Sequence, residues 1–269
     1  MGSGLVVGEE HFAVVFVVAM FIAMLACLEI GRRLGQYFRA RNDSGTSEGV
    51  ATIDAALFAL LGLLIAFTFS GAATRFEARR ELIRDEANAI GTAYLRIDLL
   101  TPAAQPALRQ DFRDYVEARL AIYADVRDPQ KLRAAQAHAA AMQARLWAHT
   151  MAGTAATPGV APTTLLIPPI NEMFDMATTR TVASQAHPPK IIFAMLAFLA
   201  LACSMTAGFS MASGHRGRQT LHIIAFSTAV TLTLYVILDL EYPRMGLFRI
   251  DRADQILRDV RASMAPSVR

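Results

Sequence analysis

The sequence predicts an all-α membrane protein with four transmembrane helices and a helical extramembrane insert. Hydrophobic residues make up 54% of the 269 residues and charged residues 18%, whereas soluble domains carry about 25% charged residues. Four apolar runs approach the roughly 20 residues that a helix needs to cross a bilayer. Between the second and third runs, residues 74–190 are more polar and show helical periodicity. These three observations favour two transmembrane hairpins separated by a helical domain.

The first hairpin is predicted to cover residues 12–73. Its first apolar run, 12–30, follows two glutamates rather than the basic segment of a signal peptide, so we interpret it as a retained span. A polar loop at 42–49 precedes the second span, which runs from about residue 51 to 73.

The insert, residues 74–190, is predicted to be a group of helices. Because no proline occurs between residues 51 and 101, the helix of the second span should continue out of the membrane. Further helices are predicted at 108–123, 129–146 and 170–186, the last opened by Pro168 and Pro169. The continuation of the second span carries a heptad-like seam, which packs either against the insert's other helices or around an oligomer axis: Phe76, Arg80, Ile83, Ala87, Ile90, Tyr94 and Ile97.

The second hairpin is predicted at residues 191–241, with spans at about 191–212 and 220–240, and a C-terminal tail follows at 242–269. The charge distribution does not decide the orientation of the spans. By the positive-inside rule, the arginines of the two short loops would place these loops in the cytoplasm. However, the opposite ends of the spans hold at least as many basic residues, namely Arg75, Arg79, Arg80, Arg84, Lys190, Arg244, Arg249 and Arg252.

The sequence predicts no enzyme. It contains no Gly-rich phosphate loop, no zinc-protease motif and no serine-hydrolase elbow, and its six histidines are scattered. Cys27 and Cys203 both lie in apolar runs, as small buried side chains do. We therefore expect no catalytic residue, no metal site and no cofactor. The net charge of +3 is attributable to arginines that flank the spans, so no nucleic-acid partner is predicted.

The second span contains few polar side chains, and these are candidates for an ion path. Asp54 lies near the start of the span and is predicted to line a pore mouth, to pair with an arginine, or to lie at the membrane interface. Thr68, Ser70 and Thr74 place hydroxyls near the other end of the span. They either help to hydrate an ion or bond back to their own helix.

Charged and amide side chains of the insert and of the fourth span's end are predicted to form a structural charge cluster. Asn171 and Asp175 are four residues apart and so share a helix face. With Glu172 they offer oxygen ligands to a divalent cation, but we favour pairing with arginines such as Arg180. The predicted cluster comprises Arg75, Glu77, Arg79, Asn171, Glu172, Asp175, Arg180, Asp239, Glu241 and Arg244.

Several segments resemble known membrane proteins. Residues 60–80 resemble bestrophins, in which a Leu- and Gly-rich span leads into an Arg-aromatic stretch, a place that Thr74-Arg75-Phe76-Glu77-Ala78-Arg79 occupies here. Asn171-Glu172-Met173-Phe174-Asp175, Arg180 and residues 86–94 and 238–246 look like the marks of a bacterial bestrophin-like family of unknown function.

The resemblance implies a homo-oligomeric, pentameric ion channel in the lipid bilayer of a bacterial inner membrane, with the insert and both termini cytoplasmic. Inorganic ions would pass along an axis lined by the second span. The pore neck of bestrophins maps to Ala59, Leu63 and Phe67, although Ala59 is smaller than the bulky residue usual there. Alternatively, Leu63 and Phe67 face lipid or a neighbouring helix.

Two further implications of the resemblance stay open. Anion selectivity is the leading suggestion for bestrophins, but bacterial relatives can also favour cations. We do not predict the calcium-binding clasp of bestrophins, because this chain has only two acidic residues, Asp239 and Glu241, where bestrophins have a long acidic run. The alternative function is a non-conducting membrane scaffold or sensor that acts through its helical domain.

Overall fold

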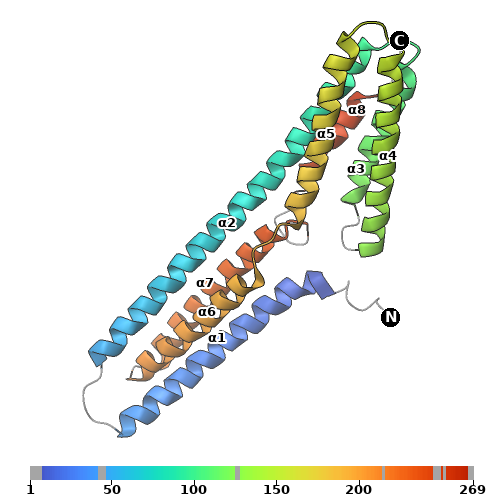
Figure 1. Cartoon of the computed structure of the whole chain (residues 1–269). Coiled ribbons are helices and arrows are strands. Elements are labelled where there is room, and N and C mark those ends of the chain that lie inside the picture. Colours follow the sequence, from blue (N-terminus) through green and yellow to red (C-terminus); the bar gives the residue numbers. More distant parts are fainter. Residues whose placement is uncertain are drawn as a thin grey trace. The chain divides into compact units, whose positions relative to one another are not determined.

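A computed structural model of the chain describes residues 8–41, 47–124, 128–213, 216–244, 250 and 253–265. These residues form helices and turns and contain no strand (Figure 1). The helices are α1 (Gly8–Arg41), α2 (Ser47–Leu95), α3 (Gln105–Ile122), α4 (Pro129–Ala155), α5 (Ala161–Gln185), α6 (Lys190–Ser210), α7 (Arg216–Glu241) and α8 (Asp254–Ser263), with short 3-10 turns η1 (Arg96–Leu99) and η2 (Met211–Ser213). The predicted all-α fold class is confirmed.

The chain divides into two compact units, and the long helix α2 contributes to both. The membrane unit comprises Met1–Phe76 and His187–Phe248, and the helical unit comprises Glu77–Ala186 and Arg249–Arg269. The limits of the four predicted domains stay predictions.

Four stretches of the membrane unit's helices are long and apolar enough to cross a membrane, and they lie in α1, α2, α6 and α7. Large apolar side chains are exposed on all four helices, and only 11% of the most apolar window of α2 is buried. A helix that is apolar on every side needs either lipid or protein around it. The membrane unit therefore has apolar faces that its described residues leave uncovered.

Glycines join α1 and α6, which run side by side (Figure 1). A methyl group on Gly31 would overlap the carbonyl oxygen of Met205 and lie 2.9 Å from its carbonyl carbon. A methyl group on Gly208 would meet Leu28 in the same way, 2.8 Å from its carbonyl carbon. The two backbones thus touch, which is how small residues allow membrane helices to associate. Buried side chains from all four helices complete the core: Met20, Met24, Leu61, Leu196, Leu199, Ala200, Cys203, Val230 and Leu234.

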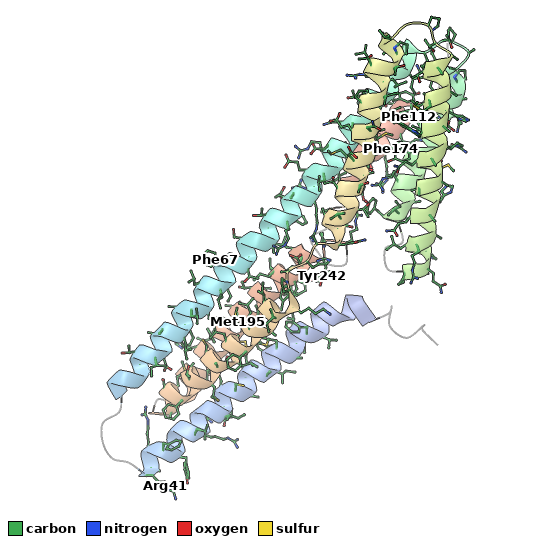
Figure 2. All side chains as sticks on the ribbon, viewed as in Figure 1. Arg41, Phe67, Phe112, Phe174, Met195 and Tyr242 are labelled. Carbon is green, nitrogen blue, oxygen red and sulfur yellow. The ribbon has the colours of Figure 1, made fainter. Side chains whose placement is uncertain are left out.

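In the helical unit, the predicted seam of α2 packs against other helices of the same unit. Ile83, Ala87 and Ile90 are fully buried, whereas Arg80 is exposed. Phe112 of α3 is also fully buried, and its ring lies 5.7 Å from that of Tyr94 (Figure 2). The seam therefore supplies the unit's own core.

Two helix starts show how local chemistry sets the ends. As the sequence predicts, α4 begins at Pro129, and Asp128 accepts hydrogen bonds from the next two free amides. In contrast, α5 begins at Ala161, and Pro168 and Pro169 lie inside it rather than at its start. Pro169 has no amide to donate to the carbonyl oxygen of Leu165, which instead accepts a 2.6 Å hydrogen bond from Arg96. A side chain from η1 thus satisfies the backbone group that the proline leaves unpaired.

Candidate functional site

One face of α2 in the membrane unit is left exposed by the residues that the structure describes. Leu63 is 53% exposed and Phe67 is 68% exposed, and Ala59 is exposed as well (Figure 2). Residues four apart lie along one side of a helix, so these three side chains form a continuous row. No ionisable residue occurs between Asp54 and Arg75. The row is therefore an apolar surface as it stands.

Two of the three predicted hydroxyl residues extend this row. Ser70 and Thr74 are exposed and lie about two and three helical turns beyond Leu63, which places them on the same face. The Thr74 hydroxyl donates a 2.9 Å hydrogen bond to the carbonyl oxygen of Ser70. Thr68 lies off the row, is partly buried, and donates to the carbonyl oxygen of Leu64. We call Ala59, Leu63, Phe67, Ser70 and Thr74 the α2 stripe.

Asp54 lies on the opposite side of α2 from the stripe. It precedes Leu63 by nine residues, about two and a half turns, and is only 8% exposed. Its carboxylate accepts a hydrogen bond from the hydroxyl of Ser210 on α6. The aspartate is thus satisfied inside the membrane unit, away from the stripe.

The predicted charge cluster is divided between three places. In the membrane unit, Glu241 is fully buried, and both Nε and Nη2 of Arg75 lie 2.9 Å from its Oε2. His187 Nδ1 lies 3.1 Å from Glu241 Oε1, and its ring stacks on Tyr242 at 4.6 Å. Asp239, two residues before Glu241 at the end of α7, is also buried, and Arg244 is partly buried. This group fastens α2 to the end of α7.

The second place is a buried network in the helical unit. Arg180 Nη1 lies 2.6 Å from Glu86 Oε2, and Arg180 Nη2 lies 2.6 Å from Asp254 Oδ1 on α8. Arg119 Nε lies 2.6 Å from Glu86 Oε1. All four side chains are at most 6% exposed. The two arginines and two carboxylates, which we call the buried quartet, balance in charge and join α2, α3, α5 and α8.

The surroundings of the quartet keep its arginines charged. The guanidinium of Arg180 lies 3.9 Å from the ring centroid of Tyr123. Burial acts to lower the pKa of Arg119, but the Glu86 carboxylate together with Tyr123 and Tyr115 raises that pKa above its ordinary value. Burial also raises the pKa of the neighbouring Tyr115, which keeps its phenol neutral. Sequence reasoning missed Glu86, Arg119 and Asp254. The available signal for Glu86 was that its carboxylate lies among the apolar positions of the α2 seam, where a buried partner is needed.

The third place is the part of α2 with which the helical unit begins. Arg79 donates to the carbonyl oxygens of Ala183 and Ala186 at 3.1 and 2.8 Å and so caps the end of α5. Glu77 pairs with Arg80 at 2.9 Å on the exposed face of α2.

Among the described residues, the α5 side chains predicted to pair with Arg180 do not contact it. Asn171, Glu172 and Asp175 are exposed on α5. Asp175 and Asn171 precede Arg180 by about 1.4 and 2.5 turns, so these side chains leave the helix in other directions. Arg180 binds Glu86 and Asp254 instead. No group of three or more His, Cys, Asp or Glu side chains within the described ranges is placed to hold a metal ion.

Comparisons with known proteins agree on one relationship. The family model described as a Bestrophin-like domain matches residues 18–255. A crystal structure of a mutated bacterial bestrophin homologue from Klebsiella pneumoniae superposes with a TM-score of 0.68 at 12% identity, covering 93% of this chain and 99% of that one. At this identity the likeness shows the fold. No curated protein sequence matches the chain.

Proposed function

Because the chain belongs to the bestrophin-like family, whose model covers most of its length, we propose that it is a homo-oligomeric ion channel. Ions cross passively along an axis lined by α2 from each copy. The proposed assembly is a pentamer in a bacterial inner membrane, with residues 12–73 and 191–241 as its membrane hairpins and the helical domain and both termini cytoplasmic. The α2 stripe is the observation that carries this proposal, since the described residues of its own chain leave it exposed.

The proposed mechanism follows from the order of side chains along the stripe. Leu63 and Phe67 form stacked apolar rings around the axis, and such a constriction gates conduction by dewetting. Ala59 is shorter, so the narrowest point lies at Leu63 and Phe67. Beyond them, the hydroxyls of Ser70 and Thr74 offer oxygen atoms to an ion that leaves the constriction. The stripe itself has no charge, so it does not select between anions and cations by a fixed charge.

The test is ion flux in liposomes that contain the purified protein. Replacing Leu63 and Phe67 with alanine should widen the constriction and raise flux several-fold or change selectivity. Phe69→Ala is the matched control, because Phe69 is also an exposed phenylalanine of α2 (42% exposed) but lies off the stripe. The control should conduct like the unchanged protein, and the mass of the assembly should fit five chains.

Two results would contradict the channel. One is equal flux in the stripe variant and the Phe69→Ala control. The other is no flux from either form across chloride, potassium and sodium gradients. The second result, or an assembly no larger than a dimer, would favour the scaffold or sensor that acts through the helical domain.

Orientation is tested separately by labelling with a membrane-impermeant maleimide in intact cells. Cys27 and Cys203 are replaced by alanine, and one cysteine is introduced at the exposed Ala40 of α1 or the exposed Ala137 of α4. With a cytoplasmic helical domain, the reagent should label Ala40→Cys and spare Ala137→Cys until the membrane is opened. The reverse pattern would place the helical domain outside, as the arginines of the short loops favour.

A further inference from the structure

The C-terminal end of α1 extends past the end of α6. Gly31 packs on Met205, Gly35 packs on Phe209 and Gly208 packs on Leu28, so the two helices run in the same direction. These contacts set Ser210, the last residue of α6, level with a residue between 30 and 36 of α1. Since α6 has 21 residues, about the length that crosses the hydrocarbon, its end marks the membrane boundary. Arg39 and Arg41 then lie at least about 5 and 8 Å beyond it at 1.5 Å per residue, on the headgroup side of the boundary.

Aromatic side chains support this depth independently. Tyr37 is 52% exposed and Phe38 is 54% exposed, and the ring of Phe38 lies 6.3 Å from that of Phe209 near the end of α6. Exposed aromatic rings concentrate at the boundary between hydrocarbon and headgroups. The arginines follow directly after this aromatic pair.

The arginines at this end outnumber the carboxylates. Arg32 and Arg33 share Glu29, with shortest distances of 2.8 and 2.9 Å. Arg41 donates to the Tyr37 hydroxyl and lies 4.8 Å from that ring's centroid (Figure 2). Within the ranges that the structure describes, Arg39 and Arg41 form no ion pair. The short loops and their flanks contain six arginines and four carboxylates, which are Arg32, Arg33, Arg39, Arg41, Arg216, Arg218, Glu29, Asp43, Glu48 and Asp54.

Arg39 and Arg41 lie beyond the end of α6, follow exposed aromatic residues and form no ion pair among the described residues. We therefore propose that they bind the phosphate groups of anionic lipids at this end of the membrane unit. The planar guanidinium offers paired donors that fit phosphate oxygens. Tyr37 holds Arg41 toward the headgroup layer. The occupant is the lipid surface, and the proposal does not depend on whether the protein conducts ions.

The experiment measures the thermal unfolding of the full chain in mild detergent with added phosphatidylglycerol or phosphatidylcholine. Phosphatidylglycerol should raise the unfolding temperature at lower mole fractions than phosphatidylcholine, and high salt should reduce the difference. An arginine near a membrane surface increases the affinity for anionic lipid roughly fivefold. In Arg39→Gln/Arg41→Gln, the mole fraction of phosphatidylglycerol needed for the same stabilisation should therefore rise on the order of 30-fold. The charge-conserving variant Arg39→Lys/Arg41→Lys should retain most of the effect.

The matched control is Arg133→Gln/Arg258→Gln, which removes two exposed arginines from the helical unit. This control should respond to phosphatidylglycerol like the unchanged chain. Three results would overturn the proposal. The first is a glutamine variant at positions 39 and 41 that responds like the control, the second is equal stabilisation by the two lipids, and the third is the same stabilisation by inorganic phosphate alone. The last result would indicate a site for a free anion rather than a lipid surface.

Discussion

Replacing Gly31 with alanine should destabilise the membrane unit strongly, although the change adds one methyl group. In a helix interior, Gly→Ala ordinarily stabilises by up to about 1 kcal/mol. At Gly31 the new methyl group would overlap the carbonyl oxygen of Met205 and lie 3.1 Å from the amide nitrogen of Phe209. These are backbone atoms, so α1 and α6 must separate. Overpacking costs about 1 to 3 kcal/mol where side chains can yield, and we expect the upper end of that range or more here.

The matched control is Gly62→Ala on α2. A methyl group at Gly62 meets no atom within 4 Å, and the residue lies in the same unit. The measurement is thermal unfolding in detergent, with the monodisperse fraction from size-exclusion chromatography. Gly62→Ala should unfold at or above the temperature of the unchanged chain, and Gly31→Ala well below it. Equal unfolding temperatures for the two variants would show that the helices do not touch at Gly31.

The features that the sequence predicts well are those that depend on local patterns. The apolar spans follow from runs of hydrophobic residues, and the seam of Ile83, Ala87 and Ile90 follows from spacing along one helix. The start of α4 follows from Asp128 and Pro129, because both residues act within one turn. In each of these cases the residue needs either a partner within a few residues of it in the chain or an apolar surface of any kind.

The features that sequence reasoning missed depend on a partner that is distant in the chain. Pro169 is tolerated inside α5 because Arg96 supplies a hydrogen bond from η1. Asp54 lies inside the membrane unit because its carboxylate accepts a hydrogen bond from Ser210 of α6. Arg180 binds Glu86 and Asp254, which are 94 and 74 residues away. Neither composition nor periodicity specifies which distant residue meets a given side chain, so the candidate polar residues were named but their partners were not.

Replacing Glu86 with glutamine should cause the largest loss of stability in the helical unit. Glu86 accepts from Arg119 and Arg180 at 2.6 Å, and its side chain is fully buried. Without its charge, Asp254 alone faces two buried arginines. Breaking a buried ion pair by removing one partner costs about 3 to 5 kcal/mol, because a charge is left uncompensated away from water. Glu77→Gln removes an exposed carboxylate paired with Arg80, so it should cost at most about 1 kcal/mol.

A double variant separates uncompensated charge from a general packing defect. Glu86→Leu combined with Arg119→Met removes one carboxylate and one arginine and leaves Arg180 paired with Asp254. Because apolar replacement of a buried ion pair is often neutral, this variant should recover most of the stability lost in Glu86→Gln. Hydrogen exchange of α3, α5 and α8 in the full chain measures the result. If the double variant exchanges as fast as Glu86→Gln, the loss arises from packing around Glu86 and not from charge. If the double variant is protected like the unchanged chain, the stability of the quartet depends on charge balance. In that case Asp254, the second carboxylate of the quartet, holds α8 to the helical unit.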